Sequence, residues 1–214
     1  MKKANIIHVI LFPVLVLLIF SLTLHAEPEY ENQHRDSYHK PDKVLEVIGV
    51  KPGMVIGEPG AGKGYFTLKL AHKVGPTGKI YANDIVQKEL NILKSKVKKQ
   101  GLTNVVIIKG KVTDPLFPKD QLDMVFMSYV LHDLSRPVPF LKNLKSSLKT
   151  NAPLVILERD PEKYTKTAWH FWKKRKILKT VKAAGFRLER IETFLPRDNI
   201  YIFYAQMKEE YLRK

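Results

Sequence analysis

Short β-branched runs alternate with stretches of helical periodicity along this chain, and that alternation restricts its fold more than any other feature. Between the runs, apolar residues recur at helical spacing, as Phe66, Leu70 and Val74 do. Strands separated by helices pair in parallel, because a parallel connection needs a crossover of a dozen or more residues. Strands are predicted at residues 54–56, 79–83, 105–108, 122–127 and 154–157.

The end of the chain departs from this pattern. Two strand-like stretches, residues 186–194 and 199–206, are joined only by the turn-forming residues 195–198. So short a connection predicts an antiparallel pair. The sequence therefore predicts an α/β fold with a doubly wound, mostly parallel seven-stranded sheet and a C-terminal antiparallel hairpin. A long basic helix is predicted at residues 168–184.

A glycine-rich turn, residues 55–67 with the sequence VIGEPGAGKGYFT, follows the first predicted strand. Ligands bind at this place in doubly wound folds, beyond the strand and before a helix. A phosphate loop would continue with Ser or Thr after Lys63 to bind magnesium, but Gly64 stands there. A dinucleotide fingerprint would need a third glycine where Tyr65 stands. Both nucleotide interpretations are therefore weakened.

The same turn places an acid, Glu58, before three alternate glycines, Gly60, Gly62 and Gly64, with Pro59 between. The pattern resembles motif I of the class I S-adenosylmethionine-dependent methyltransferases at every position. Glycines let the backbone approach a ligand closely, and the Glu58 carboxylate can meet the ammonium of the cofactor's methionine portion. A tight strand-to-helix turn without a ligand is the remaining alternative.

Asp84 ends the second predicted strand and is followed by Ile85. A carboxylate there can accept both ribose hydroxyls of the cofactor, although an Asp after a strand is also a common helix cap. The phosphate-loop interpretation predicts no acid at this position. Together with the glycine-rich turn, Asp84 favours S-adenosylmethionine as the cofactor.

The residues after the third predicted strand flank the adenine in the family that the turn resembles. An acid often follows the glycine there, but this chain has Lys111 after Gly110. The hydrogen bond to the adenine amino group is therefore in question, while Val112 can still pack on the ring. Asp114 could take the place of the acid, or it could form a simple turn with the proline that follows it.

Candidates for the chemistry follow the fourth predicted strand. By resemblance, Ser128 lines the methionine end of the cofactor, and His132 with Asp133 resembles a pair in some O-methyltransferases where the His is the base. The alternative is a His that caps or packs against the next helix. Aromatic residues at 169–172 could line an acceptor pocket or form a buried helix face. No metal ligands are predicted, and the absence of Cys excludes thiolate sites and thiol catalysis.

The resemblance covers residues 41–206 and implies methyl transfer to an acceptor that the sequence does not identify. A small molecule is favoured because no recognition domain is inserted. The net charge of +16 is scattered and mostly lysine, so a nucleic acid or protein substrate stays open. Two alternatives remain, which are a non-catalytic binding module on this scaffold and, less favoured, a phosphate-loop-like nucleotide-binding protein.

The N-terminus differs from the rest of the chain. Lys2 and Lys3 precede an apolar run from Ile6 to Leu24, and a small residue, Ala26, precedes several acids. This pattern is typical of a secretory signal, but the run is close to the ~20 residues that span a bilayer, so an uncleaved anchor with membrane association is the alternative. The charge asymmetry predicts an exported domain, periplasmic or extracellular, or one anchored on the outer side. The predicted parts are residues 1–26 (signal or anchor), 27–40 (polar linker or flap) and 41–208 (methyltransferase domain).

Overall fold

A computed structural model describes residues 34–164, 166 and 169–206 of the chain. The chain divides into two units, of which the second begins at His39 and holds the whole sheet. The predicted signal or anchor at residues 1–26, most of the predicted linker, and residues 207–208 lie outside the described residues. Within the described part, no helix is long and apolar enough to span a membrane.

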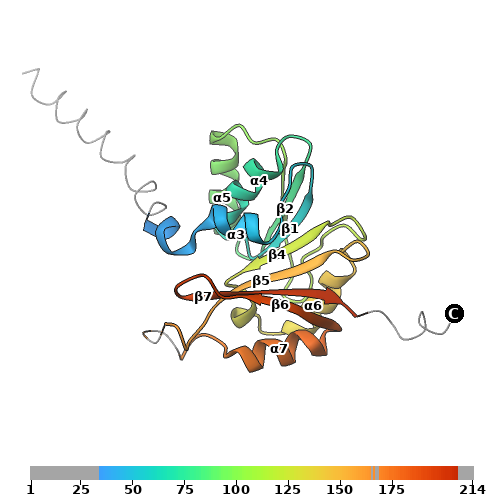
Figure 1. The fold of residues 1–214 in the computed structure, drawn as a ribbon. Coiled ribbons are helices and arrows are strands. Elements are labelled where there is room, and N and C mark those ends of the chain that lie inside the picture. Colours follow the sequence, from blue (N-terminus) through green and yellow to red (C-terminus); the bar gives the residue numbers. More distant parts are fainter. Residues whose placement is uncertain (1–33, 165, 167–168, 207–214) are drawn as a thin grey trace, which may run out of the picture. The chain divides into compact units, whose positions relative to one another are not determined.

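The second unit is built on one seven-stranded sheet with the strand order β3-β2-β1-β4-β5-β7-β6 (Figure 1). The strands are β1 (Val55–Pro59), β2 (Lys79–Asp84), β3 (Val105–Lys109), β4 (Met124–Ser128), β5 (Pro153–Arg159), β6 (Phe186–Glu192) and β7 (Asp198–Ala205). The first five strands pair in parallel, and β7 runs antiparallel to both β5 and β6. The predicted sheet with its C-terminal hairpin is confirmed.

Helices cover both faces of the sheet (Figure 1). Along β4, Phe126 belongs to one apolar core and Met127 to the other, because successive side chains of a strand point to opposite faces. Burial on both faces explains why the strands are continuous apolar runs. One core includes α3 (Pro41–Val47), α4 (Tyr65–Val74) and α5 (Gln87–Lys99), and the other includes α6 (Pro137–Lys145) and α7 (Lys174–Ala183).

The helix predicted at residues 168–184 is shorter than expected. It begins at Lys174, and residues 169–173 form a turn and a bend. The buried stripe of α7 consists of Ile177 and Val181, and extending it toward the N-terminus meets only polar residues. Of the aromatic residues at 169–172, Trp172 packs against the core that includes α7, but none of them belongs to a helix. The prediction that they form a buried helix face is wrong, since Trp169 is 85% exposed.

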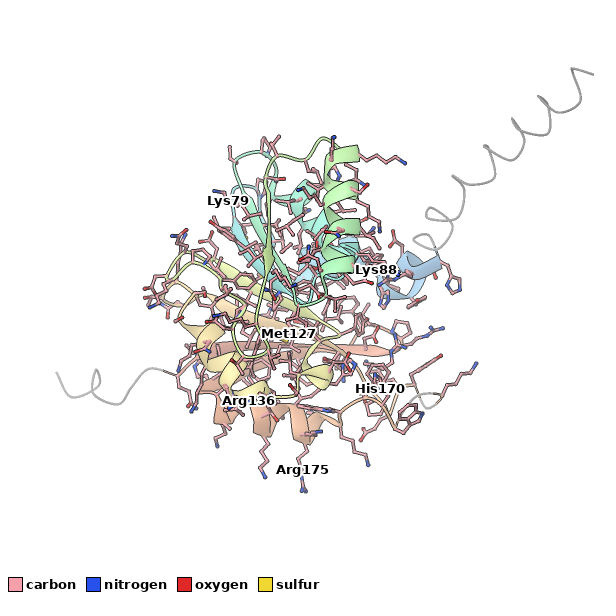
Figure 2. The ribbon with its side chains drawn as sticks, turned by 180° about the vertical axis from the view of Figure 1, so that it is seen from behind. Lys79, Lys88, Met127, Arg136, His170 and Arg175 are labelled. Carbon is pink, nitrogen blue, oxygen red and sulfur yellow. The ribbon has the colours of Figure 1, made fainter. Side chains whose placement is uncertain are left out.

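Four of the basic side chains that Figure 2 labels lie far apart on the surface. Lys79, Lys88, Arg136 and Arg175 are all exposed and project from different elements, while Met127 is buried in the middle of the sheet. These four positions fit the scattered charge that the sequence indicates.

Candidate cofactor and active site

A cavity of about 340 Å³ lies beyond the carboxyl ends of β1, β2 and β4. The chain runs from β1 outward to β3 and then returns to β4 on the other side of β1, so the cavity lies where the strand order reverses. Its volume falls in the range of about 300–1,000 Å³ that is usual for small-molecule sites. Six predicted site residues line the cavity, namely Gly60, Asp84, Ile85, Lys111, Val112 and Asp133. Glu58, Pro59, Gly62, Gly64, Ser128 and His132 are not part of that lining.

Asp84 connects two of the loops that form the cavity. Its Oδ2 accepts a hydrogen bond from the Gly62 N–H at 2.9 Å, and its Oδ1 accepts one from the Val86 N–H at 2.9 Å. Each carboxylate oxygen can accept a further hydrogen bond. Asp84 can therefore hold the glycine-rich turn in place and still receive the ribose hydroxyls of a cofactor.

The glycine-rich turn packs too closely for side chains at two of its glycines. A Cβ on Gly60 would lie 2.1 Å from Cγ2 of Val130, and one on Gly64 would lie 2.4 Å from Cδ1 of Leu93. Both glycines also have positive φ, +69° and +86°. The turn is thus fixed by packing as well as by its proposed ligand.

Glu58 lies on β1, behind the turn, and only 1% of it is exposed. Its Oε2 accepts a hydrogen bond of 2.5 Å from the Thr67 hydroxyl of α4. Burial raises the pKa of this carboxyl from 4.5 to about 8, because a charge is poorly solvated there. The carboxyl therefore ties β1 to α4, and its contact with the ammonium of a cofactor stays a prediction.

Exposed apolar side chains line the side of the cavity assigned to the adenine. Ile85, Val86 and Val112 are each about half exposed at the cavity wall. Apolar side chains held open in a concave site are typical of ligand-binding positions. Asp114 forms the turn that the sequence allows, since its Oδ1 accepts a hydrogen bond from the Leu116 N–H at 2.8 Å. Lys111 stays in the wall as the residue that replaces the usual acid.

Tyr129, directly after Ser128 at the end of β4, occupies the cavity wall in an unusual backbone conformation with φ of +56°. Its hydroxyl lies 2.6 Å from Nδ1 of His39, which in turn lies 3.6 Å from the buried carboxylate of Asp198. Burial, reinforced by the Asp198 charge, raises the pKa of Tyr129 well above its ordinary value. The contact between Tyr129 and His39 was not predicted, because the two residues are far apart in the chain.

His132 is held by an acid that sequence reasoning missed. Its Nδ1 lies 2.7 Å from Oε2 of Glu158 on β5, whose Oε1 accepts a hydrogen bond from the Leu131 N–H at 2.9 Å. Burial acts to lower the pKa of His132, but the hydrogen bond and charge of Glu158 outweigh it and raise that pKa. The available signal was an acid within an otherwise apolar strand, LVILER. Asp133, the other predicted catalytic residue, is exposed in the cavity wall.

The fold and the site together define the class I, Rossmann-like methyltransferases. Residues 50–196 match the model of the family described as methyltransferase domain, and the chain belongs to that family. A solved S-adenosylmethionine-dependent methyltransferase from Aquifex aeolicus is 30% identical, with a TM-score of 0.72 over 76% of this chain and 88% of that one.

Two further similarities are more distant. The ubiquinone/menaquinone biosynthesis C-methyltransferase UbiE of Shewanella oneidensis is 27% identical over 115 residues, which are 53% of this chain and 46% of that protein. The chain thus spans less than half the length of the curated relatives it matches. The cyclase SpnF, 18% identical with a TM-score of 0.64 over 74% of this chain and 61% of that one, shows the fold alone.

Membership of this family implies methyl transfer with S-adenosylmethionine as the methyl donor. This membership confirms the resemblance that the glycine-rich turn and Asp84 indicated. It also decides against the phosphate-loop and dinucleotide interpretations of that turn.

Proposed function

We propose that the cavity holds S-adenosylmethionine with its ribose on Asp84 and its adenine between Ile85 and Val112. The observation that carries this placement is the Asp84 carboxylate at the cavity wall, beside apolar side chains that are held open. The methionine portion then lies toward Gly60 and Tyr129, which line the same cavity. The methyl group of the cofactor then faces the part of the cavity wall where Asp133 lies.

The acceptor in this proposal is a small molecule with a planar ring. Next to the cofactor cavity, a shallow depression is lined by Arg159, Tyr164, Trp169, His170 and Phe171. The Arg159 guanidinium lies 4.8 Å from the ring centroid of Tyr164 and 5.4 Å from that of Phe171. Such a surface favours flat, partly apolar ligands. The name of the UbiE relatives, which refers to quinone biosynthesis, is compatible with a ring acceptor.

The chemistry is a direct displacement. The acceptor atom attacks the methyl carbon, the carbon–sulfur bond breaks, and the sulfonium becomes a neutral thioether. The cofactor supplies the reactivity, and the protein aligns the two reactants and excludes water. An acceptor hydroxyl must also lose a proton, for which His132, oriented by Glu158, is the candidate base.

Calorimetric titration of the full-length protein with S-adenosylhomocysteine tests the cofactor site. We expect one site per chain, and we expect Asp84→Asn to weaken binding by roughly 30-fold, since a hydrogen bond to a charged group contributes about 2 kcal/mol. Asp120→Asn is the matched control, because Asp120 is exposed in the loop before β4, at the opposite edge of the sheet. Equal affinity in Asp84→Asn and the control would contradict the ribose assignment. No binding at millimolar ligand would favour the non-catalytic module.

Transfer of a labelled methyl group into a cell extract tests the acceptor class. We expect the label in the small-molecule fraction, because the proposed acceptor surface is a shallow depression beside the cofactor cavity. His72→Ala, at an exposed position of α4, is the control variant that should retain full transfer. Label recovered mainly in protein or nucleic acid would show that this part of the proposal is wrong.

A further inference from the structure

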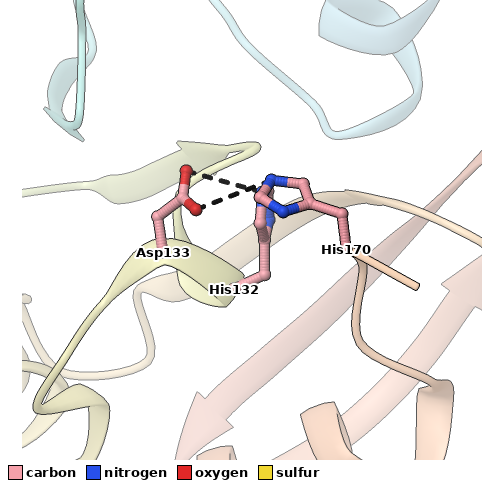
Figure 3. Close-up of side chains that lie close together, drawn as sticks. All are labelled: His132, Asp133 and His170. Atoms are coloured by element: carbon pink, nitrogen blue, oxygen red, sulfur yellow. Dashed lines mark ion pairs between the residues drawn. The ribbon is translucent and has the colours of Figure 1, made fainter. Parts of the chain in front are cut away.

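Three side chains that could bind a metal ion converge beside the cofactor cavity (Figure 3). Oδ2 of Asp133 lies 3.5 Å from Nε2 of His132, and Oδ1 of Asp133 lies 3.7 Å from Nε2 of His170. One ligand atom from each residue lies within 4.8 Å of the other two. Two ligands of a tetrahedral cation with bonds of about 2.1 Å lie roughly 3.4 Å apart. The spacing is therefore close to that of a coordination sphere.

The orientation of His132 fits the same role. Because its Nδ1 is engaged by Glu158 at 2.7 Å, its Nε2 is directed at Asp133. Glu158 is itself buried and held by the Leu131 N–H. A metal-binding His typically donates its second ring N–H to a carboxylate, which fixes the tautomer and strengthens the ligand. Glu158 supplies that outer contact here.

Ordinary hydrogen bonds do not account for this arrangement. The distances of 3.5 and 3.7 Å exceed the usual N–H···O range of about 2.7–3.2 Å. When His132 is protonated, Nε2 and the Asp133 carboxylate form the ion pair drawn in Figure 3; when it is neutral with its proton on Nδ1, the lone pair of Nε2 and that carboxylate face each other as two acceptors. A cation between them removes this repulsion, and the separation leaves room for one larger than a proton.

We propose that His132, Asp133 and His170 bind a divalent first-row transition metal ion, such as Zn²⁺ or Co²⁺. Two imidazoles and one carboxylate favour such ions over Mg²⁺ and Ca²⁺, which prefer oxygen ligands. Three protein ligands leave coordination positions open for another ligand. No metal ligands were predicted from the sequence, and His170 meets Asp133 only in the tertiary structure.

The open coordination positions of the ion face the acceptor. Asp133 lines the cofactor cavity, and His170 lines the neighbouring aromatic depression. The bound ion holds a hydroxyl oxygen of the acceptor and lowers its pKa, so that its proton passes to solvent before the oxygen attacks the methyl carbon. In the metal-bound protein the ion replaces His132 as the group that activates the hydroxyl, so the role of base given to His132 above applies to the metal-free protein. This use of the ion rests on the proposed function, whereas metal binding itself does not.

Titration with Co²⁺ tests the site, with visible absorption as the readout and Zn²⁺ as the competing ion. The sample is the full-length protein without a histidine tag, treated first with a chelator. We expect one Co²⁺ per chain. His170→Ala and Asp133→Asn should each weaken binding at least about 10-fold. Both side chains are largely exposed, so thermal unfolding should be unchanged. His72→Ala, which removes an exposed His of α4, is the matched control and should bind normally.

The outcomes separate this proposal from the cofactor site. No Co²⁺ binding by the unaltered protein, or equal affinity in the unaltered protein and both ligand variants, would overturn the metal site. Binding of S-adenosylhomocysteine is measured on the same samples, so failure of the metal site leaves the cofactor assignment intact. If metal binds but methyl transfer is equally fast after chelation, the ion does not hold the acceptor.

Discussion

Replacing Glu58 with Gln should stabilise the protein at pH 8 and leave its stability nearly unchanged at pH 4. The folded state raises the pKa of this buried carboxyl from 4.5 to about 8, chiefly through burial. The folded state therefore binds the proton more tightly than the unfolded state does. The contribution of this carboxyl to the free energy of unfolding is therefore fully present below pH 4.5 and is lost as the pH rises through 8. The loss is about 1.4 kcal/mol per pKa unit, so it is on the order of 4 kcal/mol over this window.

Gln is a close neutral counterpart of the protonated acid and can still accept the Thr67 hydrogen bond. Urea unfolding of the unaltered protein and of Glu58→Gln from pH 4 to pH 9 measures the difference between their free energies of unfolding. The other titrating groups contribute equally to both proteins, so their effects cancel in this difference. Glu46→Gln, at an exposed ion pair with Lys43, is the control and should give a nearly flat difference. A flat difference for Glu58→Gln as well would show that the carboxyl is solvated. Weaker S-adenosylhomocysteine binding by Glu58→Gln would support the predicted ammonium contact.

Gly60→Ala should be the most damaging single-methyl change in the glycine-rich turn. The new Cβ would lie 2.1 Å from Val130, and the residue would keep a φ of +69°. The left-handed conformation costs about 1–2 kcal/mol for an L-residue, and overpacking adds about 1–3 kcal/mol. We therefore expect a loss of roughly 3 kcal/mol in the free energy of unfolding, together with weaker cofactor binding because Val130 lines the cavity.

Gly62→Ala is a matched control within the same turn. Its φ is +52°, but a Cβ there has open space, so only the conformational cost of about 1 kcal/mol remains. Urea unfolding compares the two variants. Val130→Ala in the Gly60→Ala background should recover part of the loss, because it removes the colliding methyl groups. Equal destabilisation by Gly60→Ala and Gly62→Ala would mean that the contact with Val130 is unimportant.

Much of the fold could be predicted because its signals are local. The apolar run from Met124 to Met127 is buried on both faces of the sheet, and such a run indicates a central strand wherever it occurs. The short link at residues 195–198 leaves no room for a crossover, so β6 and β7 had to pair antiparallel. The start of α7 was missed because the aromatic residues at 169–172 are apolar but do not share its buried face.

Part of the candidate site followed from the same logic. Residues that directly follow parallel strands gather at one edge of the sheet, which is why Gly60, Asp84 and Val112 meet around one cavity. The direction of each side chain was less predictable. Glu58 lies within β1, two positions before the turn begins at Gly60, and its carboxyl accepts the hydrogen bond from Thr67.

The order of strands and helices along the chain, the hairpin and the glycine-rich turn were all predictable from local sequence, since each depends on residues close together in the chain. Two contacts between distant segments, Glu158 with His132 and His170 with Asp133, became visible only in the tertiary structure. Such contacts depend on which strands become neighbours and how loops meet beyond them. β4 and β5 are neighbours in the sheet, and that pairing brings Glu158 to His132.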